Sequence, residues 1–178
     1  TGDTFNLVAV VSQDQRDLQS IPSIGLAQVV IPDLGTTQMV LSVDDPIGDD
    51  HGPGKYTYPT DGVFKPGVFD IKHFEVGYDD KYLVFKITFA GPIANPWGSP
   101  NNLAVQTLDV YVDKDPGAGS GARKLLPGRN ASLPNGDGWD VAVWAEGWTP
   151  GVFVPDADDI PKHVDNLDFK VLVDAGLQ

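Results

Sequence analysis

The chain lacks cysteine, has few basic residues and contains no long hydrophobic segment. Because cysteine is absent, disulfides, thiolate metal sites and cysteine nucleophiles are excluded. The 12 Lys and Arg residues stand against 25 Asp and Glu residues, which gives a formal net charge of -13. Such a charge repels nucleic-acid phosphates and anionic membrane surfaces, so we expect neither as a partner. No apolar run approaches the roughly 20 residues of a membrane-spanning helix, so no membrane insertion is expected.

Glutamate is also scarce, because 23 of the acidic residues are Asp and only Glu75 and Glu146 are Glu. Glycine and proline are abundant, with 20 and 15 residues. Asp, Gly and Pro end helices and build turns, whereas Glu supports helices. The composition therefore predicts a mainly β protein with long loops. A chain of 178 residues is long enough for one domain with its own core.

Alternation of apolar and polar residues marks the strands. In residues 139–146 it places Trp139, Val141 and Val143 on one face and Trp144 on the other. No segment has the repeat of an amphipathic helix. We therefore predict an all-β fold, an antiparallel β-sandwich of immunoglobulin or jelly-roll type with long Asp-, Gly- and Pro-rich loops. Strands are expected at residues 5–11, 27–31, 37–43, 68–76, 81–89, 104–113, 139–146, 151–154 and 166–174.

The long loop at residues 44–67 carries the strongest local signal. Asp45, Asp49 and Asp50 are crowded there with Asp44 on a backbone turned by Pro and Gly, and Asp70 follows a Pro-Gly pair. Crowded carboxylates repel one another, and a calcium ion with its six to eight oxygen ligands relieves that repulsion. The alternative is a solvated acidic loop. We expect structural Ca²⁺ here, with Asp45, Asp49, Asp50 and Asp70 as the candidate ligands.

Catalytic motifs are not found. Residues 113–124 begin like an EF-hand loop, but position twelve is Lys124, so we interpret them as a hairpin loop. There is neither a serine nucleophile elbow nor a HExxH zinc motif. The histidines, His51, His73 and His163, show no metal-binding spacing. We therefore expect a protein that is not an enzyme.

Aromatic residues in loops or on an outer strand face suggest a binding surface. Sugar C–H faces stack on such rings while nearby polar groups bind the hydroxyls. The alternative is that the rings belong to the core or cover it. If the protein binds a polysaccharide or cell-surface polymer, the candidates are Trp144 and Trp148, then Trp97 and Tyr56.

Residues 45–60, DPIGDDHGPGKYTYPT, resemble the opening motif of the C-terminal domain of glucodextranase. Related domains end some amylopullulanases and archaeal surface proteins. The similarity extends from about residue 43 to residue 173, so residues 43–178 form the glucodextranase-like region and residues 1–42 add N-terminal strands. Further segments match in the family's order, namely residues 64–71, 95–97, 109–113 and 126–131.

The resemblance implies a β-sandwich of the carbohydrate-binding-module type, akin to family-nine modules and DOMON domains. Such domains are extracellular or bound to cell surfaces, are not catalytic, and bind sugars or attach enzymes to surfaces. By the same analogy, structural calcium would fall on Asp45, Asp49 and Asp70. Some DOMON relatives hold haem, but the single methionine, Met39, lies in a different kind of segment. No haem is therefore expected.

One departure from the family concerns the N-terminus. Residues 2–14 look like the family's closing strand, which implies permutation, a fragment cut between tandem modules, or a strand donated between subunits. The stretch from Phe5 to Val11 is apolar on both faces, so it belongs in a sheet centre or under a cover and not at a free edge. The alternative function is therefore a structural subunit of an extracellular filament or surface layer, a homo-oligomer or polymer that assembles by exchange of this strand.

Overall fold

The computed structural model describes residues 6–13, 37–51, 57–116 and 118–174, and only the backbone of residues 6–13 and 174. These residues form nine strands and no helix, which confirms the all-β prediction. None of the described segments is an apolar helix long enough to cross a membrane. The strands are β1 (Asn6–Gln13), β2 (Gln38–Asp44), β3 (Ile71–Tyr78), β4 (Tyr82–Phe89), β5 (Leu108–Val112), β6 (Val141–Ala145), β7 (Gly151–Pro155), β8 (Pro161–His163) and β9 (Lys170–Asp174).

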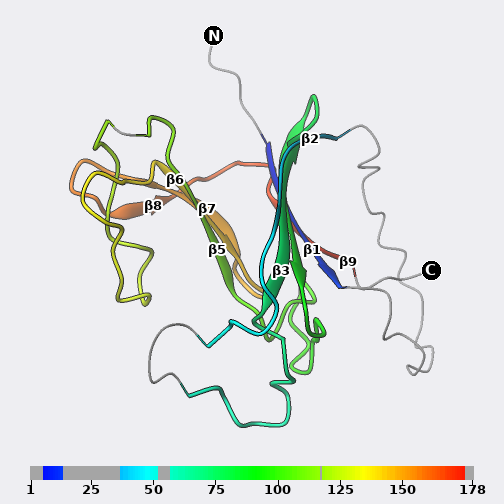
Figure 1. Ribbon diagram of the computed structural model, residues 1–178. Coiled ribbons are helices and arrows are strands. Elements are labelled where there is room, and N and C mark those ends of the chain that lie inside the picture. The colour runs from blue at the N-terminus through cyan, green and yellow to red at the C-terminus, as the bar shows by residue number, and fades with distance from the viewer. Residues whose placement is uncertain (1–5, 14–36, 52–56, 117, 175–178) are drawn as a thin grey trace.

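Two sheets face each other as a β-sandwich (Figure 1). The first has the order β2-β3-β4-β1-β9 and the second the order β5-β6-β7-β8. Strands β2, β3 and β4 pair antiparallel, as do all four strands of the second sheet. The predicted antiparallel sandwich is therefore confirmed for these pairs. The strand expected at residues 27–31 lies outside the described residues.

Strand β1 lies inside the first sheet, parallel to both of its neighbours. Asn6–Gln13 runs beside β4, with Val8 opposite Val84, and also beside β9, with Val8 opposite Lys170. The central position agrees with the prediction from its apolar sequence. The parallel direction was not expected, because alternation of side chains reports the faces of a strand and not the direction of its partner.

The main core fills the space between the sheets. Alternation in β4 directs Phe85, Ile87 and Phe89 inward, as predicted for residues 81–89. The second sheet contributes Val143 and Val152, and the buried Leu103 comes from the loop after β4. At about 25 cal/mol per Å² of apolar surface removed from water, this layer is the main source of stability.

The face predicted for Trp139 is wrong, because this residue lies in a second, smaller core. The residue is fully buried, but it packs with Ala122, Leu126 and Ala142, away from the main core that contains Val143. Its indole N–H donates to the carbonyl oxygen of Lys124 at 2.8 Å. Trp139 precedes β6 and forms an isolated bridge with Ala122, so the alternation of the strand does not extend to it.

Other differences concern strand boundaries and connections. Strand β3 begins at Ile71 and β5 at Leu108, later than predicted, because residues 65–70 form backbone-bonded turns and residues 104–107 form loop structure. The three-residue strand β8 was not predicted, since PKH has no apolar alternation. Residues 113–140 join antiparallel β5 and β6, as expected of a hairpin loop.

The core analysis predicts a large difference between two identical truncations. Leu103→Ala removes a side chain that is 0% exposed, whereas Leu41→Ala removes one that is 44% exposed. We expect Leu103→Ala to lower the free energy of unfolding by about 2–5 kcal/mol, because it leaves a cavity. The matched Leu41→Ala change should stay within about 0.5 kcal/mol. Urea denaturation of both variants measures this, and equal midpoints would contradict the assigned core.

Candidate functional site

Three loops meet at the end of the sandwich that is lowest in Figure 1, namely residues 45–51 with 57–70, residues 90–107 and residues 146–150. The Gly91 N–H donates to the Gly67 carbonyl at 2.7 Å, and the Ala90 N–H donates to the Asp70 carbonyl at 2.8 Å. A Cβ atom on Gly91 would lie 2.4 Å from the carbonyl carbon of Gly67, so only glycine permits this approach. The first two loops are thereby fixed against each other.

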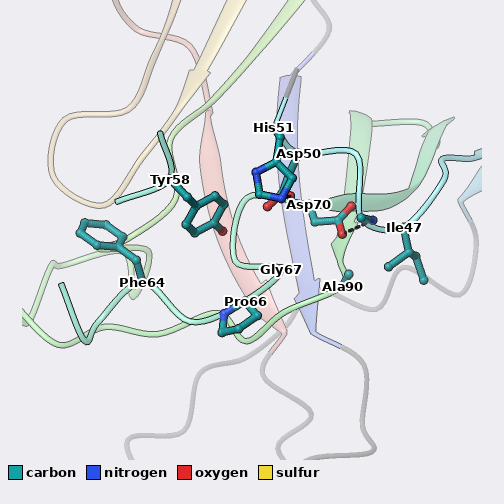
Figure 2. Close-up of a pocket in the computed structure, with 10 residues that line it drawn as sticks. Ile47, Asp50, His51, Tyr58, Phe64, Pro66, Gly67, Asp70 and Ala90 are labelled. Carbon is teal, nitrogen blue, oxygen red and sulfur yellow. Dashed lines mark hydrogen bonds and ion pairs between the residues drawn. The ribbon is translucent and has the colours of Figure 1, made fainter. Parts of the chain in front are cut away.

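A cavity of about 510 Å³ opens at this end of the molecule (Figure 2). Figure 2 shows Tyr58 and Phe64 on one side of the pocket and Ile47 on the other, with Asp50 and Asp70 between them. Most of the wall is aromatic, aliphatic or glycine, and no Lys or Arg is among the described residues that line it. The pocket is therefore an apolar recess that contains carboxylates.

The two carboxylates are buried and incompletely paired. Asp70 is 3% exposed, and its Oδ2 accepts a hydrogen bond from the Gly48 N–H at 2.7 Å. The Asp50 side chain is 7% exposed, and its Oδ1 lies 3.4 Å from His51 Nε2. Asp70 Oδ1 and Asp50 Oδ2 are buried without a hydrogen-bond partner in the described structure. A buried charge without a partner is costly, so a cation or hydroxyl donors would stabilise this arrangement.

An aromatic row leads from the pocket to the surface. His51 contacts Tyr58, Tyr58 contacts Phe69, and Phe69 contacts Phe64, with ring centroids 5.6, 5.6 and 5.8 Å apart. Phe64 then meets the exposed ring of Trp97 edge-on at 6.3 Å. Trp97 is 53% exposed, so this row ends in an aromatic ring at the surface.

The loop that carries Trp97 is held by Asn95. Its Oδ1 accepts from the Ser99 N–H at 2.7 Å and from the Ser99 hydroxyl at 2.9 Å, and its Nδ2 donates to Asn102 Oδ1 at 3.2 Å. A loop closed by side-chain bonds presents its exposed ring with little loss of entropy on binding. The loop therefore holds the exposed Trp97 ring in a fixed position.

Trp148 lies on a neighbouring loop at the same end and is 48% exposed. Its loop touches the Trp97 loop, because the Asn101 N–H and Nδ2 both donate to the Gly147 carbonyl, at 3.0 and 3.1 Å. The buried carboxylate of Glu146 accepts from the Thr149 N–H and closes the turn around Trp148. Two exposed tryptophans thus stand on loops that are tied together.

Trp144 lies elsewhere, on the outer face of the second sheet. The guanidinium of Arg129 lies 4.8 Å from the centre of its ring, and the same guanidinium forms two 2.6 Å bonds with the Asp109 carboxylate. The Tyr111 hydroxyl also donates to Asp109, and burial raises the pKa of Tyr111 to about 12. One face of the Trp144 ring is covered in this network, so the ring is less accessible than Trp97 or Trp148.

The remaining predicted residues are dispersed. Asp45 and Asp49 are exposed and do not line the pocket, unlike Asp50 and Asp70. Tyr56 lies outside the described residues. Within the described ranges, three carboxylates whose oxygens lie within 4.8 Å of one another occur at Asp113, Asp115 and Asp140, in the loop that was interpreted as a hairpin.

Several residues of the site were not predicted from the sequence. His51, Phe64 and Phe69 lie within or beside the glucodextranase-like motif, but as single aromatic residues they were indistinguishable from core residues. Asn95 was included only as part of a motif. Its cluster of hydrogen bonds with Ser99 and Asn102 is visible only once the loop is folded.

One comparison with known proteins gives a match. The family model for the SLH-like C-terminal binding module of glucodextranase matches residues 40–176. This range contains the pocket, the aromatic row and both exposed tryptophans. A search of the curated proteins found no match.

Proposed function

The chain belongs to the family of SLH-like C-terminal binding modules of glucodextranase, and on this premise we propose a module whose loop end binds, without catalysis, a polysaccharide or cell-surface glycan outside the cell. The contact surface is the loop end, with Trp97, Trp148 and the adjoining pocket. The family points to a binding module at a cell surface. The geometry of the loop end supports the assignment of that binding to these residues.

The observation that carries the proposal is the pair of exposed tryptophans on loops fixed by hydrogen bonds. Pyranose rings stack their C–H faces on indole rings, and rigid aromatic side chains lose little entropy in the complex. Carboxylates such as those of the pocket accept hydrogen bonds from sugar hydroxyls. Trp97 and Trp148 now precede Trp144 as candidates, because Arg129 covers one face of Trp144. Tyr56 remains a predicted contact.

We expect Trp97→Ala and Trp148→Ala each to lower the affinity for the bound polymer about fivefold, because each loses a stacked ring worth about 1 kcal/mol. Affinity electrophoresis on a panel of neutral and acidic polysaccharides measures the effect. Trp144→Phe is the matched control and should be retarded like the parent. The proposal fails if no polymer retards the parent, or if both alanine variants are retarded as strongly as the parent.

We also propose that Ca²⁺ binds the acidic loop and stabilises this end of the domain. The support comes from the unpartnered buried oxygens of Asp50 and Asp70, since Ca²⁺ is bound by hard oxygen ligands. Asp45 and Asp49 lie on the same loop and remain the other predicted ligands. The ion would neutralise the charge that the apolar pocket leaves unpaired.

Chelation should therefore lower the melting temperature of the parent. A ligand at 100 times its dissociation constant stabilises the folded state by about 2.7 kcal/mol. Asp70→Asn should abolish this response. In excess chelator the variant should be more stable than the parent, because its amide oxygen still accepts from Gly48 while the buried charge is gone.

Asp115→Asn is the matched control for the carboxylate cluster in the hairpin loop. It should keep the full response to calcium. A response that persists in Asp70→Asn and disappears in Asp115→Asn would place the ion at the other cluster and contradict the proposal. Differential scanning calorimetry with and without chelator provides the measurement.

A second candidate function is that of a filament or surface-layer subunit that assembles by strand exchange. The specific observation in its favour is the position of β1 between β4 and β9. Strand β1 supplies the backbone partners of both neighbours along the edges that it joins, and it belongs to the N-terminal part of the chain. The corresponding strand of a second copy would make the same parallel pairs.

Deletion of residues 1–12 tests this candidate. We expect the truncated chain to fold poorly, because two strands of the first sheet lose their shared partner, and to recover on addition of a peptide with the sequence of residues 5–11. If β1 is exchanged between chains, size-exclusion chromatography should show polymers of the parent and no polymers of the truncated chain. A monomeric parent would show that β1 pairs only within its own chain. A truncated chain as stable as the parent would contradict both pairing within the chain and exchange between chains.

A further inference from the structure

A serine, a histidine and an aspartate lie in contact at the edge of the first sheet. His73 on β3 is within hydrogen-bonding distance of two side chains of β2. Its Nε2 lies 3.1 Å from Ser42 Oγ, and its Nδ1 lies 2.7 Å from Asp44 Oδ1. These distances match those of a nucleophile, a general base and the carboxylate that orients the base.

The register of the two strands produces this arrangement. Asp44 is opposite His73, and Ser42 is opposite Glu75. The Asp45 N–H donates to the Lys72 carbonyl at 3.0 Å, so Asp44 and His73 form the adjacent non-hydrogen-bonded pair, in which side chains approach most closely. Ser42 and Asp44 are two positions apart and share one face of β2. The sheet itself therefore holds all three side chains.

The chemistry of the contacts assigns the proton positions. An ionised carboxylate only accepts hydrogen bonds, so His73 Nδ1 carries the proton that Asp44 accepts. In the neutral imidazole, Nε2 is then the acceptor and receives the hydroxyl proton of Ser42. This is the tautomer that general-base catalysis requires.

The surroundings allow a substrate to approach. Ser42 and Asp44 are exposed, and β2 is the edge strand of its sheet. Since the Asp45 N–H points toward β3, alternation directs the N–H groups of Ser42 and Asp44 away from β3. Glu75 Oε2 lies 3.9 Å from His73 Nε2 and is paired with Lys86 Nζ at 3.0 Å.

We propose that Ser42 is a nucleophile activated by His73 and Asp44, and that this sheet edge hydrolyses accessible carboxylic esters. Ser42 Oγ attacks the ester carbonyl while His73 Nε2 takes its proton. The tetrahedral intermediate expels the alcohol, which leaves with that proton, and acyl-Ser42 remains. Water then attacks the acyl group with His73 as base, which releases the carboxylic acid and restores Ser42. This activity is separate from glycan binding, because none of the three residues lines the loop-end pocket.

Labelling with a fluorophosphonate tests the nucleophile directly. The Ser42 oxygen displaces fluoride from phosphorus, and the hydroxyl proton passes to His73. We expect the full chain to be labelled on the peptide that contains Ser42, as identified by mass spectrometry. Ser42→Ala should abolish the label, and His73→Ala should slow labelling at least tenfold, at the lower end of the range for general-base catalysis. Ser132→Ala, which changes another exposed serine, should label like the parent.

Asp44→Asn distinguishes an orienting carboxylate from a structural contact. An amide N–H donates to Nδ1 and moves the imidazole proton to Nε2, so the base is lost while the fold is kept. We expect labelling to fall at least tenfold, with an unchanged melting temperature, because the Asp44 side chain is exposed. Labelling at the parental rate would overturn the role of Asp44 in the proposal.

Hydrolysis of p-nitrophenyl acetate provides the second readout. Ser42→Ala, His73→Ala and the double variant should lose the same fraction of activity, because residues that act as a unit are not additive. If Ser42→Ala keeps the full rate while His73→Ala does not, the imidazole reacts alone and the proposal is wrong. Absence of any adduct on Ser42 of the folded parent would overturn it as well.

Discussion

The hydrogen bond from the Gly91 N–H to the Gly67 carbonyl is the constraint on which the loop end depends. It joins the acidic loop before β3 to the loop after β4 at a distance that no side chain on Gly91 would permit. Asp70 follows one of these glycines closely, and Trp97 follows the other. Because the two loops meet here, an acidic pocket and an exposed aromatic ring share one end of the sandwich.

The carboxylates of the domain differ in how far their charge is screened or paired. The chain has a formal net charge of -13, and carboxylates such as Asp45, Asp49 and Asp158 lie exposed in loops, where water and salt screen them. Asp50 and Asp70 are different, because an apolar wall surrounds them and no described Lys or Arg lines their pocket. By contrast, the partly buried Asp109 is fully paired by Arg129 on the second sheet. The domain thus neutralises Asp109 internally, whereas Asp50 and Asp70 each keep one buried oxygen without a hydrogen-bond partner in the described structure.

The sequence predicted those features that depend on local pattern. Alternation in residues 81–89 assigned the inward face of β4, and the composition excluded helices. Alternation in residues 139–146 assigned Trp139 to the wrong face, because a bridge to Ala122 interrupts the alternation before β6. Two contacts join residues that are distant in the chain: Arg129 lies over the Trp144 ring, and His73 lies against Ser42. Such pairs follow from register and loop packing, which alternation within one segment does not encode.

The parallel position of β1 has a consequence for the order of folding. Strand β9 follows all the other described strands in the sequence, so the first sheet cannot be completed until Lys170–Asp174 has been synthesised. Pairing over such a sequence separation is slow, because the loop must close before its contacts stabilise it. During that interval β4 and β9 expose backbone groups along the edges that β1 joins. Until β1 pairs with both strands, these edges are the part of the first sheet that is most open to aggregation.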